Sequence, residues 1–203
     1  MRLVTADEAV SVIRSGQQIY VHCAAAAPSV LLDALVERAR VEDLRDISVV
    51  HLHIEGPGPH LAPEMARHFR HRALFIGPNA RRAVEEDRAD YVPVFLSDVP
   101  HLFTSGALPL DAVLVNATPP DRHGFCSLGT SVEAIHAAMR AAKTVIAQFN
   151  RSMPRTLGES FVHVDDIDLA VDVDAPPYEH AVGDIGDVER RIGEYVADLI
   201  PDG

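Results

Sequence analysis

Histidines at alternate positions of a predicted strand are the first residues that suggest chemistry. His51, His53 and Glu55 would share one face of such a strand, and His60 follows a turn of glycine and proline. Three residues at this spacing extend over roughly 13 Å, so one cation binds at most two of them unless another segment supplies a ligand. We therefore expect no metal site and interpret these side chains as a polar strand end that lines a cleft.

A cysteine nucleophile is the second candidate. Cys126 follows His123 by three residues, and a thiolate beside an imidazole is nucleophilic. No nearby residue supplies a third group to orient the imidazole, so we interpret Cys126 as a small buried side chain. Cys23 and Cys126 form no CxxC pair, which argues against a disulfide framework or a zinc ribbon and fits a reducing, cytoplasmic compartment.

The segment 119–129 is the best candidate for a substrate loop. It follows the most strand-like run of the chain, 111–116, and leads to a predicted helix start, where free N–H groups favour anions. Its prolines and glycines equally suit an ordinary rigid turn, and the segment alone does not separate the two interpretations. The candidate substrate-binding residues in it are Pro120, Asp121, His123, Gly124 and Gly129.

A second group of candidates leaves the next predicted strand, 145–150. Gln148, Asn150, Met153 and Pro154 would lie at the same edge of the sheet as the 119–129 loop, because the carboxyl ends of parallel strands meet at one edge. Asparagine followed closely by proline is also common turn chemistry. These four residues complete the candidate substrate-binding set, which contains no metal ligand and no catalytic residue.

The elements that must position these residues alternate between strand and helix. Strands are predicted at 18–22, 47–53, 73–76, 111–116, 145–150 and 168–173. Helices are predicted at 6–14, 28–40, 63–69, 79–86, 97–106, 130–142 and 188–199. This order predicts an α/β fold with an open, mostly parallel sheet and flanking helices, whose ligands bind at the carboxyl ends of the strands.

The composition excludes several classes of protein. The chain has 203 residues, of which 47% are hydrophobic and 24% charged, as in a globular protein with a single domain. Its net charge is −12, and most of it comes from 165–203, which contains twelve acidic residues and two arginines. An acidic surface repels phosphate backbones and anionic lipids, so we expect neither nucleic acid nor a membrane as a partner.

Several separated motifs resemble a known family. The stretches 89–93, 95–100, 119–129 and 153–158, in this order and spacing, are similar to the amino-terminal domain of the acetyl-CoA hydrolase/transferase family. That family includes 4-hydroxybutyrate and acetate CoA-transferases, and the likeness extends from Ala9 to Gly203. Phe125 stands where the family usually has tyrosine, and Glu86-Asp87 where a glycine is common.

The resemblance implies a fold and a reaction. The fold is an open α/β domain of the CoA-transferase superfamily, one of two similar halves that enclose an acyl-CoA and a carboxylate. In the family, a glutamate attacks the acyl-CoA thioester, a glutamyl-CoA thioester forms, and CoA passes to a second carboxylic acid or, in hydrolases, the thioester goes to water. CoA is then a substrate, and no other cofactor is expected.

The resemblance also implies that the nucleophile lies elsewhere. In the family, the segment similar to 199–203 precedes a glycine-containing CoA loop and the carboxyl-terminal half with the catalytic glutamate, neither of which occurs in this chain. We therefore expect a single domain, 1–203, with no catalytic residue, and do not assign the role to Glu55, Glu133 or Glu159. The missing half would act in cis or as a separate subunit.

Three hypotheses of function follow. The leading one is the amino-terminal half of a CoA-transferase or acyl-CoA hydrolase, acting on an acyl-CoA and a short-chain carboxylate. The alternative is a truncated paralogue without catalysis that serves as a binding or assembly module, and a stand-alone cysteine or metal hydrolase ranks last. Since an unpaired half exposes apolar surface, we expect a homo-oligomer under either of the first two.

Overall fold

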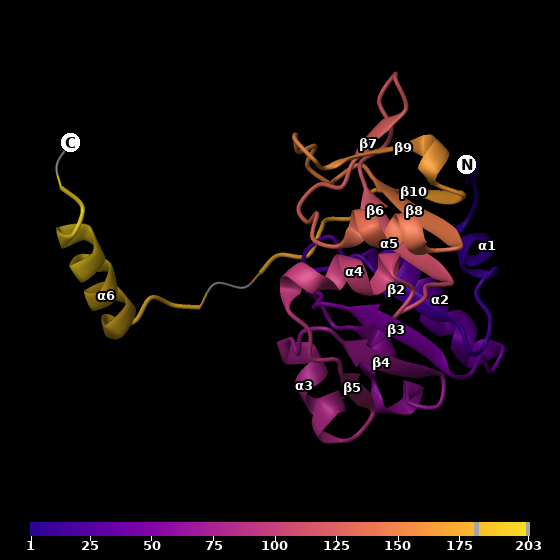
Figure 1. Cartoon of the computed structure of the whole chain (residues 1–203), viewed down its shortest axis with the longest axis horizontal. Coiled ribbons are helices and arrows are strands. Elements are labelled where there is room, and N and C mark those ends of the chain that lie inside the picture. Colours follow the sequence, from indigo (N-terminus) through magenta and orange to yellow (C-terminus); the bar gives the residue numbers. More distant parts are fainter. Residues whose placement is uncertain (181–182, 202–203) are drawn as a thin grey trace.

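A computed structural model describes residues 1–180 and 183–201. Its centre is an eight-stranded sheet in which every neighbouring pair of strands is parallel, with the order β1-β10-β8-β6-β2-β3-β4-β5 (Figure 1). These strands are β1 (Arg2–Leu3), β2 (Gln18–Val21), β3 (Ile47–His51), β4 (Phe69–Ala73), β5 (Ala89–Tyr91), β6 (Ala112–Ala117), β8 (Thr144–Asn150) and β10 (Leu169–Val173). Two further strands, β7 (Phe125–Ser127) and β9 (Phe161–His163), form a small antiparallel sheet. The predicted α/β fold is confirmed.

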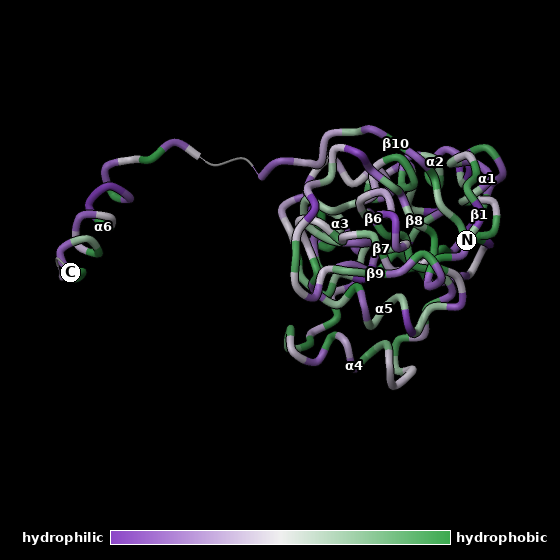
Figure 2. The backbone as a smooth tube through the Cα atoms, turned by 90° about the horizontal axis from the view of Figure 1, so that it is seen from above, coloured by the Kyte–Doolittle hydropathy of each residue, from purple (hydrophilic) through white to green (hydrophobic). Residues whose placement is uncertain are grey.

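Helices cover both faces of the sheet. The helices are α1 (Ala6–Val10), α2 (Ser29–Val41), α3 (Pro78–Glu85), α4 (Val99–Thr104), α5 (Ile135–Ala141) and α6 (Asp187–Asp198), of which α6 is exposed throughout and covers no face of the sheet. Figure 2 shows α1 and α2 on one side of the sheet and α4 and α5 on the other. A hydrophobic core lies on each face of the sheet. Alternate residues of β6 pack into one or the other, Leu114 on the α2 side and Val115 on the α5 side, so every residue of this strand is buried.

The start of the chain follows local rules. Thr5 Oγ1 accepts from the Glu8 N–H at 3.2 Å, and the Glu8 carboxylate accepts from the Thr5 N–H at 2.9 Å. This reciprocal capping box begins α1 where the sequence predicts it. The helix ends at Val10, well before the predicted residue 14.

Two further predicted helices are wrong in part. The predicted helix 63–69 is a 3-10 turn, Pro63–Met65, followed by β4. The strand predicted at 73–76 shares only Ala73 with β4, because arginines at the half-buried positions of β4 obscure its strand pattern. One of them, Arg70, donates to Asp90 of β5 at 3.0 Å. The helix predicted from 130 begins only at Ile135, since the preceding residues form turns that Ser131 and Glu133 anchor to the end of β2 through His22 and Tyr20.

The acidic end of the chain carries α6, as its helical spacing predicts. Every residue of α6 is exposed, including the apolar side chains of Val188, Ile192, Tyr195 and Val196. Of the predicted terminal segment, Asp202 and Gly203 lie outside the described residues. Within the described ranges, no helix has both the length and the apolar composition needed to cross a lipid bilayer.

Candidate functional site

The order in which strands are added to the sheet reverses between β2 and β6. From β2 the strands β3, β4 and β5 follow one another outward, and the chain then returns to place β6 on the other side of β2. In open parallel sheets, ligands bind at the carboxyl ends of the strands beside such a point. The residues that follow β2, β6 and β8 are therefore the natural candidates for a site.

Gln148 of β8 reaches the amino end of α2. Its Oε1 accepts from the N–H of Val30 at 3.0 Å and from that of Leu31 at 3.3 Å. The helix has no side-chain cap of its own, because Pro28 precedes it. A distant strand therefore supplies the acceptor that local sequence does not, while Nε2 of the buried Gln148 has no hydrogen-bond partner among the described residues.

Asn116 of β6 is the register partner of Gln148. It is 1% exposed, and its Oδ1 likewise has no partner within 1–180 and 183–201. Two unpartnered polar atoms on adjacent strand ends are costly unless a ligand or water satisfies them. Asn116 is not among the candidates predicted from the sequence, although one signal was present, a polar residue at the end of an otherwise apolar run.

His22 and Glu133 hold the segment before α5 against the end of β2. His22 Nδ1 accepts from the Asn116 N–H at 3.3 Å, and Nε2 donates to the Ser131 carbonyl at 2.8 Å. Burial lowers the pKa of His22, so the imidazole is neutral. Glu133 accepts from the Tyr20 hydroxyl at 2.7 Å and from the Cys23 N–H at 3.3 Å. Both carboxylate oxygens thus have donors, which suits an anchor rather than a nucleophile.

The 119–124 part of the candidate loop is a constrained turn. Asp121 Oδ1 accepts from the N–H groups of His123 at 2.9 Å and Phe125 at 3.0 Å, and Oδ2 pairs with Arg155 at 2.7 Å. The hydrogen bonds from Phe125 and His123, helped by Arg155, lower the pKa of Asp121. Pro120 and His123 are exposed, and Gly124 has φ +85°. The turn chemistry of these residues is therefore evident in the structure.

Gly129 lies against Met153 and Pro154. Gly129 has φ +70°, and Thr156 Oγ1 donates to its carbonyl at 2.9 Å. Ser127 Oγ accepts from the N–H of Thr156 at 3.0 Å and from that of Gly129 at 3.2 Å. The structure thus brings together three residues of the predicted set from two loops.

Asn150 has a different position from Gln148. Its Nδ2 donates to the Ala175 carbonyl at 2.7 Å, and its Oδ1 accepts from the N–H groups of Ser152 and Ala175, both at 3.1 Å. All its polar atoms are used to join the end of β8 to the chain after β10. The predicted substrate-binding residues therefore lie in four places. Some lie in the turn held by Asp121, some at the contact of Gly129 with Met153, and Asn150 and Gln148 each lie apart.

The cysteine hypothesis finds no geometric support. Cys126 is fully buried in β7, and burial raises the pKa of its thiol to about 11. His123 is exposed, and its Nε2 accepts from Arg122 at 3.0 Å. A protonated, buried thiol without an adjacent base is a poor nucleophile.

The strand-end histidines separate. His51 and His60 meet a third histidine, His71, in the core. His53 instead lies edge-on to Phe75, with 5.9 Å between ring centroids, and Glu55 pairs with His180 at 3.0 Å.

An apolar hollow opens beyond the ends of β3, β4 and β5. Its volume is about 470 Å³, within the range of small-molecule sites. Phe75 and Phe95 in its wall are 59% and 79% exposed, so the hollow is a ready surface for an apolar partner. It is lined by Leu52, His53, Leu74, Phe75, Tyr91, Val94, Phe95, Leu96 and Val99.

Known proteins resemble this chain along its whole length. It is 43% identical over 202 residues to the 4-hydroxybutyrate coenzyme A transferase of Clostridium kluyveri, covering 100% of this chain and 47% of that protein. It is 40% identical over 198 residues to the succinyl-CoA:acetate/propanoyl-CoA:succinate CoA transferase of Fasciola hepatica, covering 97% and 41%. The chain therefore spans about half the length of these curated relatives.

Solved structures agree with the sequence relatives. RipA from Yersinia pestis superposes with a TM-score of 0.89 at 30% identity, covering 100% of this chain and 49% of that one. The 4-hydroxybutyrate CoA-transferase from Porphyromonas gingivalis has a TM-score of 0.80 at 33% identity, with 100% and 46% covered. The family model of the acetyl-CoA hydrolase/transferase N-terminal domain matches residues 1–177. The chain belongs to the acetyl-CoA hydrolase/transferase family, with an α/β domain typical of its CoA-transferases.

Proposed function

We propose that this chain is the amino-terminal domain of a CoA-transferase that moves CoA between an acyl-CoA and a short-chain carboxylate. The observation that carries the proposal is the 43% identity to a CoA-transferase over the whole chain. The reaction proceeds through a glutamyl-CoA thioester whose glutamate lies outside residues 1–203. The single domain 1–203 then supplies one wall of the substrate cleft.

Gln148 and Asn116 are the centre of that wall in our proposal. The free N–H hydrogens of the Gln148 amide suit a carboxylate oxygen, and the amino end of α2 beside it favours negative charge. Asn116 offers a second polar group on the adjacent strand. Their role is to bind and orient the carboxylate or the acyl carbonyl before the glutamate reacts.

The two loops of the predicted set form the rim. The Asp121–Arg155 ion pair fixes the turn that carries Pro120, His123 and Gly124, and the Gly129–Met153 contact fixes the second loop. Asn150 holds the end of β8 against the chain after β10, and Pro154 lies beside Gly129. We propose that these residues shape the entrance, while Gln148 makes the direct contact.

The carboxyl-terminal half would meet the exposed apolar surfaces. The apolar side chains of α6 and the aromatic side chains at the hollow are exposed in this chain, and burial of such area is the main driving force of association. We propose that this half acts in cis or as a separate subunit, and that without it the chain self-associates. The two free, buried cysteines fit a cytoplasmic location.

The test is to assay transfer with the carboxyl-terminal half present. The protein is incubated with acetyl-CoA or butyryl-CoA and several short-chain acids, and the thioester is trapped with borohydride or hydroxylamine and mapped by mass spectrometry. We expect transfer and a modified glutamate outside residues 1–203. A modified glutamate within this chain would refute our location of the nucleophile.

The alternative, a non-catalytic assembly module, predicts a different pattern. In that case the reconstituted protein stays inert, and acyl-CoA does not protect the chain against heat. If acyl-CoA protects the chain against heat but no transfer occurs, the proposed substrate site stands and the proposed reaction is refuted.

A further inference from the structure

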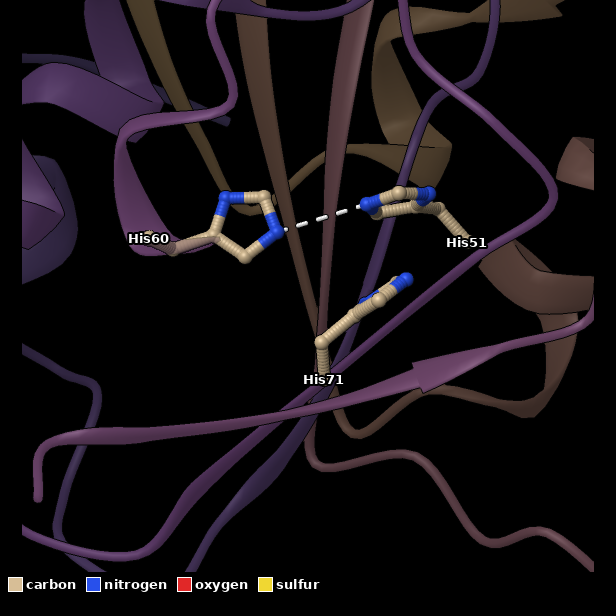
Figure 3. A group of neighbouring side chains, drawn as sticks. All are labelled: His51, His60 and His71. Atoms are coloured by element: carbon tan, nitrogen blue, oxygen red, sulfur yellow. Dashed lines mark hydrogen bonds between the residues drawn. The ribbon is translucent and has the colours of Figure 1, made fainter. Parts of the chain in front are cut away.

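Three histidines converge in the core on the α2 side of the sheet. His51 ends β3, His71 lies in β4, and His60 lies in the 3-10 turn Pro59–Leu61, as Figure 3 shows. Their exposed fractions are 0%, 2% and 3%. One ring nitrogen from each lies within 4.8 Å of the others, and the Nε2 atoms of His51 and His60 are 3.3 Å apart.

The fold brings these rings together from distant sequence positions. In the β3–β4 register, His71 pairs with Val49 and His51 with Ala73, so the two histidines lie diagonally on one face of adjacent strands. The turn that follows Gly58, with φ +58°, then places His60 over them. The strand register therefore supplies the third ligand that the 51–60 segment lacks.

The hydrogen bonds define the state of His71. Its Nδ1 lies 2.9 Å from the Val49 carbonyl, which only accepts, so Nδ1 carries the proton and Nε2 presents a lone pair. That Nε2 is buried without a partner in the described part of the chain. A backbone carbonyl that fixes the proton on one nitrogen and frees the other is the usual outer partner of a metal-binding histidine.

The other two rings are also incompletely paired. Nδ1 of His51 and Nδ1 of His60 have no partner among the residues described. The rings of His51 and His71 lie 4.0 Å apart between centroids, so they are packed closely. Burial of three neutral imidazoles whose nitrogens lack hydrogen-bond partners lowers the stability of the fold unless a ligand binds those nitrogens.

We propose that His51, His60 and His71 bind one divalent first-row transition-metal ion of the Zn²⁺ class. In tetrahedral zinc sites, Zn–N bonds of 2.0–2.1 Å place ligand nitrogens roughly 3.3–3.4 Å apart, and the His51–His60 pair already has this separation. Imidazole nitrogens favour zinc, copper or nickel, whereas magnesium and calcium prefer oxygen ligands. Water or hydroxide supplies the fourth ligand, because the group contains no carboxylate or thiolate.

The bound ion has a structural role in this proposal. It joins β3, β4 and the Pro59–Leu61 turn, and two strands, β2 and β6, lie between β3 and the strand of Gln148, β8. Binding to the folded chain alone stabilises that chain in proportion to the logarithm of free metal. The proposal is therefore independent of the CoA chemistry.

The test uses untagged protein stripped with a chelator and then titrated with Zn²⁺ and Co²⁺. We expect one equivalent of either ion to bind, the visible spectrum of a four-coordinate cobalt site, and a higher unfolding temperature with zinc. His60→Asn should weaken binding at least about tenfold, since the loss of even an outer partner of a metal ligand has an effect of this size. His53→Asn, two residues from His51 but outside the cluster, is the matched control and should bind normally.

X-ray absorption of the zinc-loaded wild type covers the case in which His60→Asn does not fold. We expect three imidazole nitrogens and one oxygen in the first shell. Failure of the wild type to bind one equivalent, equal binding by His60→Asn, or a shell of oxygen ligands would each overturn the proposal.

Discussion

Gly129 and Met153 are in such close contact that a methyl group on Gly129 would overlap the thioether of Met153. Gly129 also has φ +70°, a conformation that other residues adopt at a cost. The two loops of the candidate site are therefore held together by a position that only glycine fills without strain.

The first prediction concerns Gly129→Ala. We expect a loss of about 2–5 kcal/mol in the free energy of unfolding, from the positive φ and from overpacking together. Urea unfolding followed by circular dichroism measures it. Gly16→Ala is the control, because Gly16 has φ +78° but no atom within 4 Å of the added methyl. Equal losses in the two variants would contradict the contact with Met153.

Asn116→Leu separates a binding role from a packing role. Removal of a buried oxygen without a partner should leave the stability unchanged or slightly higher. If Asn116 binds substrate, the KM of the complete enzyme should rise about tenfold, the effect of about 1.4 kcal/mol. Ser48→Ala is the control, since Ser48 Oγ is also buried and unpartnered but lies near the start of β3. An unchanged KM in Asn116→Leu would exclude the contact.

Gln148→Leu should destabilise the chain. The N–H groups of Leu31, which is buried, and of Val30, which is part-buried, lose their acceptor, at a cost of about 1–3 kcal/mol for a fully buried group. Gln148→Glu keeps an acceptor oxygen and should be less destabilised, although its charge repels a substrate carboxylate and raises KM. Thermal and urea unfolding provide the measurement, and equal stability of wild type and Gln148→Leu would contradict the capping role.

Asp121→Asn should show a pH-dependent loss of stability. Hydrogen bonds from Phe125 and His123, with Arg155, lower the pKa of Asp121 in the folded chain. A lowered folded pKa stabilises the fold fully above the unfolded pKa, about 3.9, and this contribution disappears as pH falls through the folded pKa. Urea unfolding from pH 7 to pH 3 should show the wild type and the variant converging at low pH. A difference in the free energy of unfolding that does not change with pH would mean that the charge of Asp121 does not stabilise the fold.

Cys126 should resist alkylation in the folded chain. Burial raises the pKa of the thiol to about 11, so little thiolate exists at pH 8. Iodoacetamide followed by mass spectrometry should label Cys126 only in urea, and Cys126→Ala should retain transfer activity within about twofold. Rapid labelling of Cys126 in the native chain, with loss of activity, would support the hypothesis that Cys126 is a nucleophile.

Local signals in the sequence are enough for elements that depend on neighbouring residues. The Thr5–Glu8 capping box, the apolar run of β6 and the helical spacing of α6 each involve residues a few positions apart, and all three are confirmed. The family resemblance was also evident from separated motifs, and the match over 1–177 confirms it. Short-range patterns of this kind determine type and order of elements.

Tertiary contacts decided the rest. Gln148 caps α2 from 117 and 118 positions away in the chain, and His71 joins His51 only through the register of β3 and β4. Residue types and spacing contain no information about such pairs, because strand order and register are set by burial of the whole sheet. The sequence by itself therefore determined the family and the alternation of its longer strands and helices. Only the structure revealed β1, β5, β7 and β9 and decided which polar groups meet.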